Sequence, residues 1–413
     1  MASEVVEASG HLIDSGILNG IFDTVIRHGA SFEVMKFRIG RTNAEPSLLT
    51  MRVNADTDAV LRDLVENLVP LGCQIVGGRD ATIRLADQDG CAPVDFYSTT
   101  NHETHIRRDG RWLTVQQQRM DAAIVIDGDR ATCRKLRDVR EGDGVVCGVE
   151  GIRVIPAFQD RDRLGFAFMT NEISSERRVE VAVSRVAEMM RSARTSGSPI
   201  AFVVGPVVVH TGGAPHLVEL IRAGYVQVML SGNALAVHDA EYAMFGTSLG
   251  VNMETGRVVE GGHHHHMRAI NVIRRAGGIR AAVEQGLLAS GIMYECVRHG
   301  VDYVLAGSIR DDGPLPDTMM DLIEAQDRYA ASLKDVSLVL ILASMLHGIG
   351  VGNMLPSSVR AVCVDINPAV VTKLADRGSS QTVGIVTDTG FFLHQLAEHL
   401  SVGAITPTQK GCA

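Results

Sequence analysis

The sequence contains no long run of lysine or arginine, and its formal net charge is -9. Nucleic acids and anionic membranes bind positively charged surfaces, so the sequence predicts neither as a partner. The longest apolar runs, such as VSLVLILASML (336–346), are shorter than the ~18 residues that a membrane-spanning helix needs. The segment MASEVVEASG (1–10) lacks the cationic start and the apolar stretch of a signal peptide.

The seven cysteines are scattered and include no CxxC pair. This pattern is typical of reduced thiols in a cytosolic protein, and it argues against a zinc ribbon. A chain of 413 residues with 46% hydrophobic residues is long enough for two or three domains with large cores.

The hydrophobic patterning divides the chain into three regions. Residues 1–90 combine alternating strands, SFEVMKFRIGR and SLLTMRVNA, with amphipathic helices. Asp56 or Asp58 is the expected N-cap of the second helix, and the region predicts a small α+β domain. Residues 91–180 contain short strands between glycine and aspartate turns, which predict a β-rich domain. In residues 181–413, continuous apolar runs such as PIAFVVGPVVVH alternate with helices, so we expect an α/β domain with a Rossmann-like parallel sheet.

In an open parallel sheet, ligands bind beyond the carboxyl ends of the strands. The segments expected there are rich in glycine, short polar residues and carboxylates, which predicts a binding site at this edge. These segments are 205–213, 231–239, 306–317, 347–358, 363–368 and 386–391.

A dinucleotide site is predicted where a buried strand precedes Gly348, Gly350 and Gly352. Glycines in a turn let the backbone approach a phosphate closely. The next strand ends at Asp365, whose carboxylate is suited to the ribose hydroxyls of NAD and would repel the 2′-phosphate of NADP. The spacing is not the strict GxGxxG fingerprint, so a simple tight turn is the alternative. Other short polar groups at neighbouring strand ends support the site: Asn233, Asp388 and Thr389.

The loop SIRDDGPLPD (308–317) contains Asp311, Asp312 and Asp317 around two rigid prolines, which restrict the backbone and hold nearby side chains. The alternative is a solvated charged loop.

Four consecutive histidines, His263 to His266, precede a predicted helix. Consecutive side chains fan out around a helix start, and no cysteine or carboxylate is spaced to complete a ligand set, so no metal is expected. The helix dipole disfavours added positive charge there, and a neutral imidazole is a suitable proton carrier near pH 7. The alternative is that most of these histidines are exposed or structural.

Several long motifs are similar to those of the LOR/SDH-domain family, which includes NAD-dependent ornithine cyclodeaminases. They include GHLIDSGILNGIFD, FYSTTNHETHI, SGNALAVHDAEYAMFGTSLGV and GNMLPSSVRAVCVDINP, and the resemblance covers nearly the whole chain. It implies a C-terminal nucleotide domain like that of deoxyhypusine synthase, bound NAD and a homo-oligomer, either a dimer or a tetramer. The cofactor residues that the resemblance implies are Asn233, Ala234, Val351, Gly352, Asn353, Met354, Leu355, Asp365, Asp388 and Thr389.

The reaction that the resemblance implies converts ornithine to proline and ammonia, with a hydride that leaves the α-carbon for NAD and later returns. It needs proton carriers and a dry pocket. The candidate catalytic residues are His264, Asp311, Asp312, Asn101 and His102. Two alternatives stay open at this point: an NAD-linked amino-acid dehydrogenase of the lysine or saccharopine type, and a non-catalytic NAD-binding regulator.

Overall fold

The computed structural model describes residues 2–13, 16–40, 45–156, 176–253, 255, 257, 259, 264–311, 313–378 and 382–402. The chain forms two compact units. The first comprises Met1–Gly165 with Asn353–Ser358, and the second comprises Phe166–Gly352 with Val359–Ala413. No helix in the described part of the chain is long and apolar enough to cross a bilayer.

The first unit begins with an antiparallel four-stranded sheet in the order β2-β3-β1-β4. Its core contains alternate residues of β3, such as Met51, together with Ile21 of one helix and Leu64 of the other. The predicted cap of the second helix is wrong, because the side chain of Thr57 accepts the hydrogen bond from the Val60 N–H (3.3 Å). The elements are β1 (Ala2–Gly10), α1 (Ile17–Arg27), β2 (Ser31–Arg38), β3 (Ser47–Ala55), α2 (Asp58–Leu68), the 3-10 helix η1 (Val69–Leu71) and β4 (Cys73–Ile75).

A seven-stranded sheet follows, in the order β11-β6-β7-β9-β8-β10-β5, and all its strand pairs except β7–β9 are antiparallel. Its core includes the fully buried Ile106, Ile124 and Val146. Strand β5 precedes the predicted domain boundary at residue 90 but pairs with β10 of this sheet. The elements are β5 (Thr82–Leu85), β6 (Glu103–Arg108), β7 (Arg111–Gln116), β8 (Ala123–Asp127), β9 (Arg130–Arg134), the 3-10 helix η2 (Leu136–Asp138), β10 (Gly144–Cys147) and β11 (Ile152–Ile155).

The second unit contains the predicted parallel sheet, in the order β17-β16-β13-β12-β18-β19-β20. Apart from the edge strand β17, this is the doubly wound order 3-2-1-4-5-6, whose direction reverses between β12 and β18. The α/β prediction is therefore confirmed. The strands are β12 (Ile200–Val204), β13 (Val228–Gly232), β16 (Asp302–Ala306), β17 (Thr318–Met319), β18 (Leu338–Leu342), β19 (Arg360–Asp365) and β20 (Thr382–Val386).

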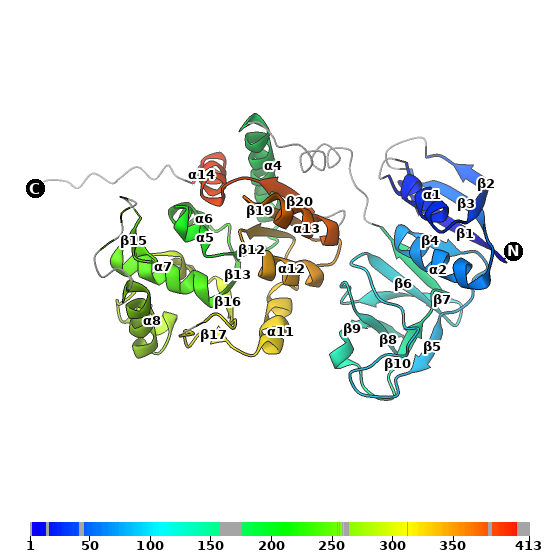
Figure 1. Cartoon of the computed structure of the whole chain (residues 1–413), viewed down its shortest axis with the longest axis horizontal. Helices are drawn as coiled ribbons and strands as arrows, with labels where there is room; N and C mark the ends of the chain where they lie inside the picture. Colours follow the sequence, from blue (N-terminus) through cyan, green and yellow to red (C-terminus); the bar gives the residue numbers. More distant parts are fainter. Residues whose placement is uncertain are drawn as a thin grey trace, which may run out of the picture. The chain divides into compact units, whose positions relative to one another are not determined.

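Helices cover both faces of this sheet (Figure 1). Leu340 and Leu342 pack with α4, α6 and α14, whereas Ile341, which points to the opposite face, lies next to α12 and α13. The helices are α4 (Glu176–Thr195), α5 (Val207–His210), α6 (Ala214–Arg222), α7 (Asn233–Phe245), α8 (His265–Ala276), α9 (Ile279–Glu284), α10 (Ile292–His299), α11 (Leu322–Ser332), α12 (Met345–Met354), α13 (Pro368–Gly378) and α14 (Thr389–His399). A short antiparallel ribbon pairs β14 (Thr247–Ser248) with β15 (Val251–Asn252).

The structure corrects two predictions in this unit. The expected strand over PIAFVVGPVVVH ends at Val204, and residues 207–210 form helix α5. Pro206 has a φ of -63°, which suits the start of a helix and not a central strand. The predicted glycine turn at 348–352 is likewise wrong, because these glycines lie within α12. A Cβ on Gly348 would lie 2.7 Å from Ile341 Cγ2, so this glycine lets the helix pack closely on β18.

Candidate active site

The carboxyl ends of β12 and β18 meet at the point where the strand order reverses. Val204 pairs with Leu342 at the ends of these strands. Just beyond them, Gly205 lies against the carbonyl of Ala343 so closely that a Cβ would overlap that oxygen. Only glycine fits there, because the missing Cβ lets the two strand ends pack closely against each other at the reversal point.

Asp365, Asp388 and Thr389 share the ends of the neighbouring strands β19 and β20. Asp365 is the last residue of β19, and its Oδ1 accepts a hydrogen bond from the Asn367 N–H (2.8 Å). Asp388 caps α14, where its Oδ1 accepts from the Phe391 N–H (2.9 Å). The buried Thr389 begins that helix. The structure thus brings these three predicted cofactor residues to one stretch of the edge.

Asn233 and Ala234 begin α7 directly after β13. The Asn233 side chain is buried, and its Oδ1 accepts hydrogen bonds from the Leu315 N–H and the Thr318 hydroxyl, both at 3.0 Å. Asn233 therefore holds the end of this loop, at Leu315 and Thr318, beside the strand ends, so this part is not merely a solvated surface segment.

Within that loop, Asp311 Oδ2 accepts a hydrogen bond from the Ser308 N–H (2.7 Å), and Asp312 lies outside the described residues. The imidazole of His347, in the first turn of α12, lies beside the end of β13, where its Cε1 would lie 3.0 Å from a Cβ on Gly232. Burial lowers the pKa of His347, and the nearby carboxylate of Asp311 only partly opposes that shift. His347 begins the segment 347–358 that the sequence places at this edge, although no role was predicted for it.

Val351 and Leu355 are buried apolar residues, and Gly352 lies near the end of α12. Asn353, Met354 and Leu355 are part of the first unit.

Asn101 and His102 also belong to the first unit, whereas His264 and Asp311 belong to the second. Asn101 is buried, and its carbonyl accepts a hydrogen bond from the Ser357 N–H (2.7 Å). Burial lowers the pKa of His102. That all these candidates act on one substrate stays a prediction.

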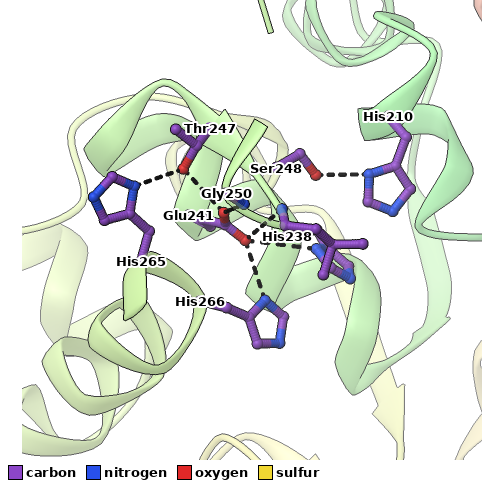
Figure 2. Close-up of polar contacts among 9 residues, drawn as sticks. His210, His238, Glu241, Thr247, Ser248, Gly250, His265 and His266 are labelled. Atoms are coloured by element: carbon purple, nitrogen blue, oxygen red, sulfur yellow. Dashed lines mark hydrogen bonds and ion pairs between the residues drawn. The ribbon is translucent and has the colours of Figure 1, made fainter. Parts of the chain in front are cut away.

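The histidine run spreads around the start of α8. His263 lies outside the described residues, and His264, the residue before the helix, is exposed. The ring of His265 stacks on Phe245, with centroids 4.7 Å apart, and His265 Nδ1 lies 2.9 Å from the Thr247 hydroxyl. His266 points the other way, toward Glu241 of α7 (Figure 2).

Glu241 is fully buried and lies at the centre of this cluster (Figure 2). Its Oε1 accepts hydrogen bonds from the Thr247 hydroxyl (2.9 Å) and the Gly250 N–H (3.0 Å). Its Oε2 accepts from the Leu249 N–H (3.1 Å) and lies 3.1 Å from His266 Nδ1. Burial alone would raise the pKa of Glu241, but the surrounding donors and imidazoles outweigh it and hold the pKa well below the usual range.

Two further histidines continue the cluster toward the sheet. The rings of His266 and His238 lie 4.7 Å apart, and those of His238 and His210 lie 4.6 Å apart. His210, the last residue of α5, places its Nδ1 2.6 Å from the Ser248 hydroxyl (Figure 2). Burial, and next the proximity of His238, lowers the pKa of His210.

The structure overturns the reason given for expecting no metal. Ligand atoms of His238, Glu241 and His266 lie within 4.8 Å of one another, so a carboxylate and a second histidine do come together with the run. Sequence reasoning missed His238 and Glu241, although a signal was present. They lie three residues apart on α7, and this spacing places them on one side of an otherwise largely apolar, buried helix.

A doubly wound parallel sheet with an acid at a strand end next to its reversal point defines a Rossmann-type nucleotide-binding domain. Family models match most of the chain, and the model for residues 184–396 describes a Rossmann fold. Residues 3–102 match the LOR/SDH bifunctional enzyme conserved region, and residues 103–183 match the first C-terminal region of ArgZ-like arginine dihydrolases. Residues 184–396 match the Rossmann-fold C-terminal region of the same proteins. The chain belongs to the family that these LOR/SDH and ArgZ-like C-terminal regions define, as its motifs predict.

Curated relatives extend over nearly the whole chain. The bifunctional arginine dihydrolase/ornithine cyclodeaminase AgrE of Nostoc sp. is 49% identical over 407 residues, which cover 96% of this chain and 58% of that protein. The ornithine cyclodeaminase of Methanothermobacter thermautotrophicus is 46% identical over 410 residues, which cover 98% of this chain and 100% of that protein. The chain thus spans little more than half of the first relative and the full length of the second.

Solved structures show the same likeness. Apo ArgZ, a cyanobacterial arginine dihydrolase, matches with a TM-score of 0.85 and 46% identity over 97% of this chain and 58% of that one. AgrE in a ternary complex with ornithine and NAD+ matches with a TM-score of 0.54 and 48% identity, over 97% of this chain and 57% of that one.

Proposed function

We propose that this chain is an NAD-dependent ornithine cyclodeaminase, a lyase that converts L-ornithine to L-proline and ammonia. The observation that carries the proposal is the match, over the full length of that protein, to the ornithine cyclodeaminase of Methanothermobacter thermautotrophicus. The solved complex of AgrE with ornithine and NAD+ supports the substrate and the cofactor.

The edge of the second unit fits NAD. The strand order reverses between β12 and β18, and Asp365 presents a carboxylate at the end of the neighbouring strand β19. This carboxylate would accept hydrogen bonds from the ribose hydroxyls, which favours NAD over NADP. When bound, NAD accepts a hydride and gives it back. The other residues that would hold it are Asn233, Ala234, Val351, Gly352, Asn353, Met354, Leu355, Asp388 and Thr389.

The chain's own side chains would orient the amino acid, move protons and exclude water. Asp311 lies on the loop that Asn233 anchors, and so on the same edge. Asp312, His264, Asn101 and His102 complete the proposed catalytic set. The working form would be a cytoplasmic homo-oligomer.

The test is to incubate the purified protein with NAD and ornithine and to measure proline and NADH together. A cyclodeaminase forms proline while free NADH stays at or below the enzyme concentration. NADH that rises in proportion to product would show an ordinary dehydrogenase instead. NAD binding without any turnover would show a regulator.

A further inference from the structure

The cluster of His210, His238, Glu241 and His266 brings ionisable groups together from separate segments of the second unit (Figure 2). His238 is more than nine-tenths buried, and its Nδ1 has no hydrogen-bond partner within reach, since the nearest Glu241 oxygen is 3.8 Å away. A buried imidazole nitrogen without a partner is costly in a region that only supports the fold, and it points to a functional site.

The contact between Glu241 and His266 sets the tautomer of the imidazole. Because an ionised carboxylate can only accept, the proton of a neutral His266 must be on Nδ1, 3.1 Å from Oε2 of Glu241. Nε2 then keeps its lone pair. A carboxylate behind one ring nitrogen leaves the other nitrogen as a base and stabilises the imidazolium that forms.

The hydrogen bonds of Glu241 favour this role over a metal site. Two donors occupy Oε1, and the Leu249 N–H and the His266 ring occupy Oε2. These four contacts fill the acceptor capacity of a carboxylate. A metal ion at Oε2 would have to displace a backbone N–H or the proton on His266.

The cluster also reaches the edge of the sheet. The hydroxyl of Thr211, the residue after His210, lies 3.4 Å from that of Thr389, one of the proposed cofactor residues. The ring contacts therefore place the histidines in the order His210, His238 and His266, starting from the cofactor edge.

We propose that His266, oriented by Glu241, is the proton carrier of the cyclodeamination, with His238 and His210 lining the path to the edge. This inference rests on the proposed function, and it moves the role from His264 to its neighbour. The α-ammonium of ornithine gives one proton to Nε2 of His266, and its nitrogen lone pair then forms the C=N bond as the hydride leaves the α-carbon for bound NAD. The uncharged δ-amine attacks the same carbon and passes one of its protons to the α-nitrogen. The bond between the α-carbon and the α-nitrogen then breaks, ammonia leaves, and the ring keeps a C=N bond that takes the hydride back. The protonated imidazole gives its proton to the ammonia, which departs as ammonium. Glu241 is a positioning residue.

The test uses two variants and a matched control. His266→Asn keeps a donor for Glu241 but removes Nε2, and Glu241→Gln keeps the shape of the side chain but removes the charge. Each should lower kcat by about 10²–10⁴-fold, the usual contribution of general acid–base catalysis. The KM for ornithine and the Kd for NAD should change by less than about threefold, because neither group is the main source of ground-state binding. The control, His394→Asn, alters an exposed histidine on α14 that pairs with Glu398, and it should leave kcat unchanged.

Two further measurements do not depend on how far kcat falls. In His266→Asn, the dependence of kcat on pH that arises from an imidazole base should be absent. In ¹⁵N spectra, the His266 resonances, assigned by their loss in that variant, should show a protonated Nδ1 in the wild type and a changed tautomer in Glu241→Gln.

A wild type that makes no proline would overturn both the proposed function and this inference. A wild type that makes proline, with a kcat in His266→Asn within threefold of normal, would overturn the inference alone. So would a stoichiometric bound metal that the wild type needs for activity and the variant lacks.

Discussion

Replacing Glu241 with Gln should destabilise the second unit in a way that depends on pH. The side chain is fully buried and accepts hydrogen bonds from Thr247, Gly250 and Leu249 as well as facing His266. An amide can keep the two bonds at Oε1 through its own oxygen. In the place of Oε2, however, its NH2 group would face the Leu249 N–H, a donor against a donor.

An unsatisfied, partly buried N–H costs about 1–3 kcal/mol, and replacing a charge-assisted bond to His266 by a neutral one costs about 1 kcal/mol more. The variant should therefore unfold with a free energy about 2–4 kcal/mol lower than the wild type at pH 7. Since domains are typically stable by about 5–15 kcal/mol, it should still fold.

The sign of the pH dependence follows from the depressed pKa of Glu241. A carboxyl group whose folded pKa is lowered stabilises the fold fully above the pKa of the unfolded chain, about 4.3, and progressively less as the pH falls below it. The difference between wild type and variant should thus be constant from about pH 7 to pH 5 and should shrink below about pH 4.

Urea unfolding of both proteins at several pH values between 7 and 3.5 measures this difference. A difference below 0.5 kcal/mol at pH 7, or one that does not shrink at the acid end, would refute the account of Glu241 as a charged, fully bonded group.

Three further outcomes are expected. Asp365→Ala should weaken NAD binding by about 10–100-fold, because a hydrogen bond to a charged group contributes about 1.5–3 kcal/mol; an unchanged affinity by calorimetry would show that the ribose is held elsewhere. Gly348→Ala should lower the unfolding temperature, because the new Cβ would lie 2.7 Å from Ile341 Cγ2. The control Gly350→Ala, whose Cβ would have no atom within 4 Å, should be neutral or stabilising. Equal effects of the two substitutions would contradict this packing. Thr57→Ala should destabilise the first unit by about 1 kcal/mol in urea unfolding, and no loss would mean that another residue caps α2.

The parallel sheet could be predicted because strands buried on both faces read as continuous apolar runs, as in Leu338–Leu342. An apolar run gave the wrong prediction after Val204, because the valines at 207–209 suit a buried helix as well as a strand. The Gly205–Pro206 pair, which ends the strand, was the signal that could have separated the two. The glycines of α12 were misread for a similar reason. The sequence does not distinguish a glycine needed for close packing from one needed for a turn. The contact of Gly348 with Ile341 in the structure shows that this glycine is needed for packing.

The edge residues were predictable because strand polarity alone brings their segments together. Asp365 at the end of β19 and Asp388 at the start of α14 follow from that rule. The histidine cluster was not predictable in this way. The sequence displays four histidines, but which one faces Glu241 depends on the rotation of α8 relative to α7, and this is set by packing.

The fate of the hydrogen on the α-carbon of ornithine tests the central claim most directly. In a cyclodeaminase, this hydrogen leaves the α-carbon, is held in the closed site and returns to the same carbon of the ring. Ornithine that carries deuterium at the α-carbon should therefore give proline that retains the deuterium, with NAD needed only in catalytic amount. Proline without the deuterium, or deuterated NADH that accumulates in proportion to product, would contradict the mechanism.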